Sequence, residues 1–102
     1  MEFNTKVMYK CNSFFAAKTF LTIVEKEGYV WMTGEKPTKY THYNYSKKCI
    51  YYGVQNDGRI FYRDTWDLPV DRYVVGFNPN VVNSIEYYLR KNGVQWIKAI
   101  ES

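Results

Sequence analysis

Apolar and polar residues alternate and then change to a helical period near the start of the chain. Residues 5–11 alternate roughly, as expected of a half-buried strand. Apolar side chains then recur at the spacing of one helix face, at Phe14, Ala17, Leu21 and Val24. An Asn-Ser pair before this stretch can cap a helix, and Gly28 can end it in a left-handed conformation. The pattern predicts a helix over about residues 13–27 and a strand over 29–33.

A β-hairpin is predicted in the middle of the chain. Residues 49–55 and 59–65 are both rich in strand-forming side chains, and Asn56-Asp57-Gly58 separates them. Asp-Gly favours such a turn because Gly adopts positive φ without steric cost. A three-residue loop would set Val54 opposite Ile60. This register assigns Ile50, Tyr52, Val54, Ile60 and Tyr62 to one face of the hairpin, and Tyr51, Phe61 and Arg63 to the other.

The last third of the chain has the pattern of a strand, a helix and a second strand. A connection over residues 64–71 leads to an expected strand at 72–77. Asn78-Pro79 is typical of a helix start, with Asn as the cap and Pro at the first helical position. The apolar stripe of this second helix would be Val82, Ile85 and Leu89. Gly93 ends it, and residues 94–100 are expected to form the last strand.

Two distant segments resemble one another, and this bears on the fold class. Residues 26–32 and 91–97 each combine a helix end, a glycine and a strand with Trp at the third position after the glycine. The expected fold is α+β, with two helices on one face of a largely antiparallel sheet of about five or six strands. A split β-α-β, ferredoxin-like arrangement with an inserted hairpin is one version of it. The alternative is that any helix-Gly-strand junction looks like this.

Composition bounds the class of protein. The 102 residues suit one domain spanning 1–102, and 20% of them are aromatic, with eleven Tyr. The formal net charge of +4 permits contact with nucleic acid or an acidic protein and requires neither. Cys11 and Cys49 are too few for a disulfide scaffold, so we expect both thiols to be reduced and buried in strands. No signal segment or long apolar run is present, so a cytoplasmic location without membrane contact is expected.

Residues for catalysis are sparse. His42 is the single histidine, and neither cysteine has an activating motif beside it. Asp64, Asp67 and Asp71 are the one acidic cluster, in a segment that Pro69 makes a loop rather than a helix. We therefore predict no catalytic residue, no metal site and no cofactor. If the protein were an enzyme, His42 and these carboxylates would be the first residues to substitute.

Lysines and tyrosines interleave over residues 36–52, and this segment is the predicted binding surface. Cations neutralise phosphates while rings stack on bases, but Tyr also gives a protein interface a large contact area at low entropic cost. A third interpretation is a Tyr-rich edge that packs over the sheet. Trp66, in a loop, is the tryptophan expected to be exposed, whereas Trp31 and Trp96 are expected in the core. The predicted binding residues are Lys39, Tyr40, His42, Tyr43, Tyr45, Lys47, Lys48, Tyr51, Arg63 and Trp66.

Residues 26–34, Lys-Glu-Gly-Tyr-Val-Trp-Met-Thr-Gly, stand before a Tyr- and Asn-rich segment and a short hairpin. Over about residues 5–65 this pattern resembles small α+β accessory proteins encoded by phages of low-GC Gram-positive bacteria. The resemblance implies binding to a host protein, including restriction, CRISPR or nucleotide-signalling defences, and assigns no functional residue.

The expected function is therefore that of a non-enzymatic inhibitor that occupies the surface of a host factor, such as an anti-CRISPR or anti-restriction protein. The basic charge disfavours mimicry of DNA. Alternatives are sequestration of a nucleotide signal and binding of single-stranded nucleic acid. The oligomeric state stays open, a homodimer included.

Overall fold

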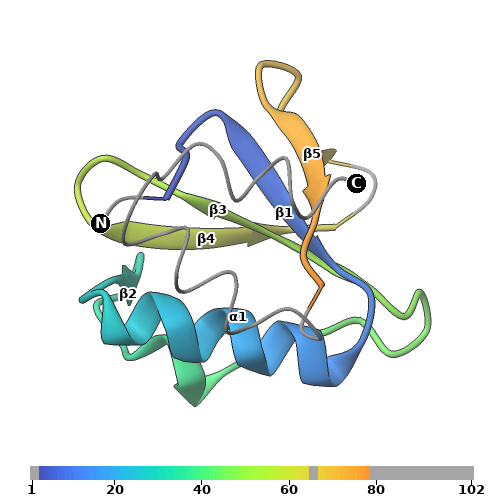
Figure 1. Cartoon of the computed structure of the whole chain (residues 1–102), viewed down its shortest axis with the longest axis horizontal. Helices are drawn as coiled ribbons and strands as arrows, with labels where there is room; N and C mark the ends of the chain where they lie inside the picture. The colour runs from blue at the N-terminus through green and yellow to red at the C-terminus, as the bar shows by residue number, and fades with distance from the viewer. Residues whose placement is uncertain (1–2, 65–66, 79–102) are drawn as a thin grey trace.

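One α-helix packs on a five-stranded sheet in residues 3–64 and 67–78, the part of the chain that the computed structural model describes (Figure 1). The helix is α1 (Phe14–Lys26), and a short 3₁₀ turn, η1 (Pro37–Lys39), lies against it. The strands are β1 (Val7–Cys11), β2 (Val30–Trp31), β3 (Ile50–Val54), β4 (Arg59–Arg63) and β5 (Tyr73–Gly76).

The sheet is mixed rather than largely antiparallel, which corrects the expectation from the sequence. Its order is β2-β4-β3-β1-β5. The pairs β1–β3 and β3–β4 are antiparallel, whereas β1–β5 and β2–β4 are parallel. Strands that run in the same direction need a crossover connection, and α1 provides the one from β1 to β2.

The unit β1-α1-β2 is a split β-α-β arrangement. Because β4 is antiparallel to β3, and β3 to β1, the strands β1 and β2 run in the same direction. The β3–β4 hairpin lies between them in the sheet. The described residues contain one α-helix instead of the two expected. The predicted helix that starts at Asn78-Pro79, the strand over 94–100 and Trp96 belong to residues 79–102, outside the described residues.

Helix α1 begins and ends where its sequence signals place it. The Ser13 side chain accepts a hydrogen bond from the Ala16 N–H at 3.0 Å, which satisfies one of the free donors of the first turn. Gly28 follows the C-cap with φ of +89°, a conformation that side chains with a Cβ rarely adopt. The predicted helix is confirmed.

The hairpin register is also confirmed. Val54 pairs with Ile60, as expected from the three-residue loop. The Gln55 N–H donates to the Arg59 carbonyl at 2.8 Å and closes that loop, in which Gly58 has φ of +82°. The register sends alternate side chains to opposite faces of the sheet.

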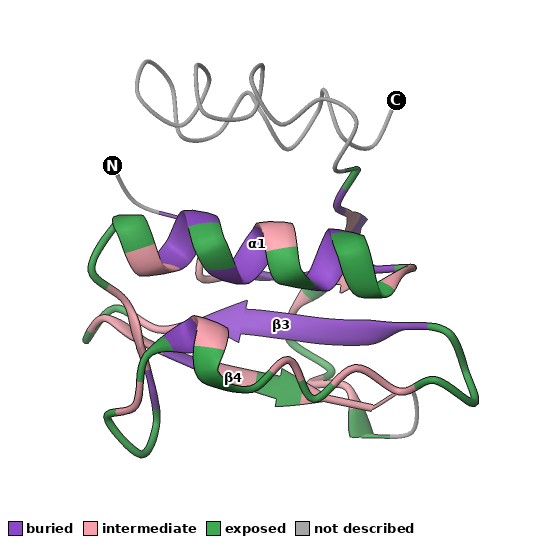
Figure 2. Cartoon of the chain, turned by 90° about the horizontal axis from the view of Figure 1, so that it is seen from below, coloured by how far each residue is buried: buried purple, intermediate pink, exposed green. Residues whose placement is uncertain are grey.

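The main core lies between α1 and the sheet. Phe20 of the helix stacks on Tyr52 of β3, with ring centroids 5.2 Å apart, and Trp31 is buried beside them as expected. Figure 2 shows α1 directly over β3, a strand buried along its whole length. Both cysteines are buried with free thiols, and burial raises the pKa of Cys11 well above its usual value.

Candidate binding site

The segment after β2 is fixed to the helix and the core, which gives the aromatic side chains that follow it a defined position. The Glu25 carboxylate of α1 accepts from the Thr38 N–H at 3.1 Å and from its hydroxyl at 2.7 Å. The Trp31 indole N–H donates to the Pro37 carbonyl at 3.0 Å, in a buried position. These contacts anchor η1 before the chain enters residues 40–49.

A second set of contacts shapes the loop itself. The Tyr52 hydroxyl donates to the Thr41 carbonyl and ties the loop to β3. Asn44 and Cys49 form an isolated β-bridge, with the Asn44 N–H 3.3 Å from the Cys49 carbonyl oxygen. The turn that this bridge closes has Lys48 at φ of +55°, so a charged residue stands in the left-handed region. Residues 44–49 therefore form a tight turn.

Phe14, Tyr43 and Tyr45 pack on one another, and Phe15 stands next to Phe14 in the first turn of α1; these four residues are here called the Phe14 patch. Phe14 stacks on Tyr45 with centroids 6.0 Å apart, and Tyr43 contacts both rings edge-on. Phe14 is 40% exposed, Phe15 64% and Tyr45 68%. Large rings so exposed on adjoining segments are typical of a contact surface.

A second group of rings surrounds a pocket at the other end of the loop. His42 stacks on Tyr62 of β4 with centroids 4.0 Å apart and an interplanar angle of 9°. Trp31 contacts His42 edge-on at 5.1 Å, and Tyr40 lies 5.8 Å from it. Together these four side chains line a pocket of about 510 Å³, here called the His42 pocket. Partial burial lowers the pKa of His42, so its ring is neutral at pH 7.

Two of the predicted cationic residues are paired with carboxylates. Lys39 Nζ lies 2.5 Å from Glu35 Oε2, and this contact lowers the pKa of Glu35. Lys47 Nζ lies 3.9 Å from Asp64 Oδ1. Lys48 is exposed. The positive charge is therefore balanced locally at two of the three lysines predicted to bind.

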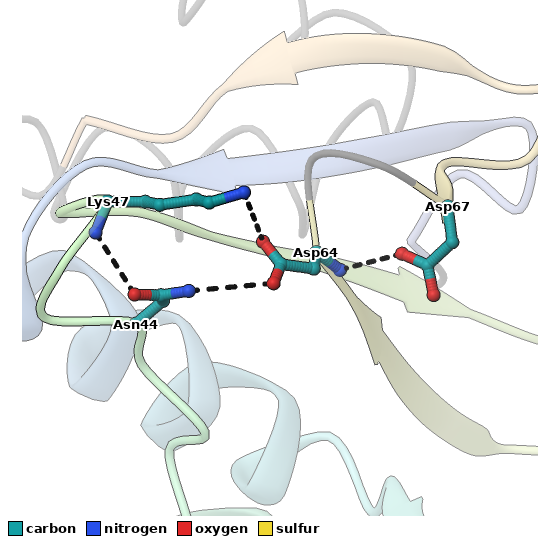
Figure 3. A network of polar contacts seen from close by, with 4 residues as sticks. All are labelled: Asn44, Lys47, Asp64 and Asp67. Atoms are coloured by element: carbon teal, nitrogen blue, oxygen red, sulfur yellow. Dashed lines mark hydrogen bonds and ion pairs between the residues drawn. The ribbon is translucent and has the colours of Figure 1, made fainter.

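Figure 3 shows the polar network that joins the turn to the end of β4. The Asn44 side-chain amide donates to Asp64 Oδ2 at 3.5 Å, and the Lys47 N–H donates to Asn44 Oδ1 at 3.0 Å. The Asp64 N–H donates to Asp67 Oδ1 at 3.0 Å. Asp64 and Asp67, two of the three carboxylates of the acidic cluster, thus bind neighbouring parts of the chain.

The predicted binding residues divide into separate groups. Tyr40 and His42 belong to the His42 pocket, and Tyr43 and Tyr45 to the Phe14 patch. Tyr51 is 6% exposed and lies in a small cluster with Met8 and Cys49, so its ring cannot reach a partner; this corrects the expectation.

The remaining two predicted residues are Arg63 and Trp66. The Arg63 guanidinium lies 4.8 Å from the Phe61 ring centroid and donates to the Tyr62 carbonyl at 2.8 Å. It reaches the lining of the His42 pocket from β4. Trp66 is outside the described residues.

Sequence reasoning missed Phe14, Phe15 and Tyr62. Phe14 was expected in the buried stripe of α1, yet it stands in the first helical turn, where the turn of residues 45–48 lies beside it instead of the sheet. The adjacent pair of phenylalanines was an available signal. Successive residues of a helix point about 100° apart, so a single stripe could not bury both.

No group of three or more His, Cys, Asp or Glu side chains converges within residues 3–64 and 67–78. In the same ranges, no helix has the length and apolar character to cross a membrane. Comparisons of the chain with protein-family models, curated protein sequences and solved structures find no match.

Proposed function

We propose that this chain is a binding protein without a catalytic step, and that it docks on a partner protein through the Phe14 patch. The observation that carries the proposal is the exposure of three large rings, Phe14, Phe15 and Tyr45, on a rigid helix and the tight turn beside it. Aromatic residues are enriched at protein interfaces and dominate their binding energy. Because the loop is already anchored, a partner would meet rings that are held in place, which lowers the entropic cost of binding.

The pairing of lysines supports a protein partner over a nucleic acid. Binding to phosphates gains affinity when free cations replace condensed counterions. Lys39 and Lys47 already face Glu35 and Asp64, so they offer less to a phosphate backbone. An interface built on rings with balanced charges around them is typical of protein recognition.

The proposed partner is a protein of a bacterial host, and the proposed outcome is inhibition by covering its surface in the host cytoplasm. The resemblance to phage accessory proteins supports this choice of partner. The patch supports the mode of action, because a rigid surface covers a site without chemistry.

The experiment is affinity capture with the full chain from the lysate of a low-GC Gram-positive host, followed by purification of the captured protein and titration. Two substitutions remove the patch. Phe15→Glu puts an acidic side chain in the first turn of α1, which favours the helix, and Tyr45→Ser removes the most exposed ring of the patch. We expect the double variant to weaken Kd about 30-fold or more, the loss typical of interface hot spots.

The matched control is Tyr73→Ser on β5, which removes a ring that is 74% exposed outside the patch. We expect it to bind like the unsubstituted chain. Equal affinity of the double variant and the unsubstituted chain would contradict the proposal. So would an eluate that absorbs at 260 nm and loses its captured material on nuclease treatment.

A further inference from the structure

The His42 pocket exists because two neighbouring strands differ in length. β2 pairs with β4 only at Val30–Arg59 and Trp31–Ile60. The chain then turns away at Gly34, whose N–H donates to the Trp31 carbonyl at 2.7 Å and whose φ is +90°. β4 continues beyond this point, so its remaining residues line a recess at the sheet edge. Its volume of about 510 Å³ lies within the roughly 300–1,000 Å³ range of ligand sites.

The rings of the pocket suit a flat or cationic group. Trp31, His42 and Tyr62 contact one another through faces and edges and hold their positions mutually. Tyr40 completes the wall from the loop side. Aromatic walls attract cations through the ring quadrupole and also stack on planar groups. His42, neutral at pH 7, does not repel a cation.

Three carboxylates line the pocket, those of Glu35, Asp64 and Asp67, and the one guanidinium in the lining is that of Arg63. Two of the carboxylates are already paired, Glu35 with Lys39 and Asp64 with Lys47. Arg63 already donates to the Tyr62 carbonyl. Asp67 accepts one bond through Oδ1, and its Oδ2 has no hydrogen-bond partner among the described residues (Figure 3). Acceptors of this kind complement a ligand that is rich in donors.

The geometry points to the guanidinium of an arginine side chain as the ligand of the His42 pocket. A guanidinium is planar, always charged and carries five donors, so it can stack on the rings while it donates to Asp67 Oδ2. The chain itself shows this stacking, since the guanidinium groups of Arg63 and Arg72 lie over Phe61 at 4.8 and 4.9 Å. A nucleotide fits less well, because its phosphates would meet the Asp67 carboxylate, which forms no ion pair among the described residues.

This assignment rests on the proposed function, because the arginine would belong to the partner protein that docks on the Phe14 patch. The two claims concern different side chains. Binding of an arginine peptide to the pocket can therefore be tested without the partner.

The test is a titration of the full chain, followed by NMR, with the blocked peptide Gly-Gly-Arg-Gly-Gly. The same peptide with citrulline replaces the guanidinium by a neutral group of nearly equal shape. Guanosine monophosphate is the third probe. We expect saturable shifts of the Tyr62 and His42 resonances with the arginine peptide, and affinity lower by about tenfold or more with citrulline, because the charge is lost.

Variants then test the acceptors. Glu35→Gln with Asp67→Asn removes two pocket charges, and the new amide of residue 67 keeps an oxygen for the Asp64 N–H. We expect about tenfold weaker peptide binding. Glu27→Gln removes one exposed carboxylate charge just after α1, outside the pocket, and should leave the affinity unchanged.

Three results would overturn the assignment: equal affinity for the citrulline peptide, unchanged affinity of the double variant, or shifts in the pocket with guanosine monophosphate alone. None of these results bears on the Phe14 patch. A failure of the proposal for that patch would appear only in the titration with the purified partner.

Discussion

Two phenylalanines of α1 each stack on a tyrosine from another part of the chain, and the two pairs have opposite surroundings. Phe20 stacks on Tyr52 with centroids 5.2 Å apart, and neither side chain is exposed. Phe14, six residues earlier, stacks on Tyr45 at 6.0 Å; Phe14 is 40% exposed and Tyr45 68%. The contact geometry is similar, and the difference lies in what stands behind the rings. The first pair lies between α1 and the sheet, whereas the second lies between α1 and a surface turn.

The comparison teaches that ring stacking alone does not show which task a ring performs. A buried pair gains stability mainly from the apolar area that it removes from water. An exposed pair leaves most of that area available to a partner, with its orientation already fixed. We therefore expect substitutions of interior rings to change folding and substitutions of surface rings to change binding.

The largest effect should come from Phe20→Ala. Removing this ring leaves a cavity between α1 and β3, and the free energy of unfolding should fall by about 3–5 kcal/mol. Urea unfolding measures it. Phe15→Ala, the same change at an exposed site of the same helix, should alter the value by less than about 0.5 kcal/mol. Equal losses of unfolding free energy for the two variants would contradict the distinction between interior and surface rings.

Phe61 is an intermediate case, half-buried on the face of the sheet opposite α1, and Gly53 permits its position. An alanine Cβ at residue 53 would lie 2.4 Å from Phe61 Cζ and 2.9 Å from Met8 Sδ. The ring cannot move freely, because the guanidinium groups of Arg63 and Arg72 lie over it. We expect Gly53→Ala to cost about 1–3 kcal/mol in urea unfolding, the usual cost of overpacking.

Gly76→Ala is the matched control for that substitution. A Cβ at Gly76 meets nothing within 4 Å. Stability should stay unchanged or rise by up to about 1 kcal/mol, because alanine restricts the unfolded chain. If both glycine variants lose the same stability, close packing around Phe61 is not the cause. Phe61→Leu in the Gly53→Ala background should recover part of the loss.

Local signals in the sequence predicted the local structure well. The Ser13 cap, the Gly28 end of α1 and the Asn56-Asp57-Gly58 loop each depend on a few adjacent residues, and all three form as expected. The parallel pairing of β5 with β1 could not be predicted in this way. It joins segments more than sixty residues apart, so no turn specifies it.

The binding site was harder to predict for a related reason. The register correctly sent Tyr51 away from α1, but exposure depends on what covers that second face. There Tyr51 clusters with Met8, with Phe61 and Leu68 packed against them, so it is buried. Phe14 shows the reverse, since its helical spacing predicts burial and its place in the first turn leaves it exposed. Periodicity predicts the direction of a side chain, and tertiary neighbours decide its burial.

A smaller effect should come from the anchor between α1 and η1. Hydrogen bonds from Thr38 lower the pKa of Glu25 below its usual 4.5. The folded state therefore favours the ionised carboxylate, so this contribution to stability is complete above the unfolded pKa and disappears as the pH falls through the folded one. Glu25→Gln should flatten the pH dependence of unfolding in that acidic range. Thr38→Ala should do the same, whereas curves parallel to that of the unsubstituted chain would contradict this anchor.

The smallest effect on folding should come from Tyr45→Ser, and this result decides how the binding experiments are interpreted. Tyr45 is 68% exposed, so its loss should change the free energy of unfolding by less than about 0.5 kcal/mol despite the stacking on Phe14. Thermal and urea unfolding both measure it. A loss above about 1 kcal/mol would mean that the surface pair helps to hold the turn against α1. In that case weaker partner binding by this variant would reflect a displaced loop, and the separation between rings for folding and rings for contact would fail at the Phe14 patch.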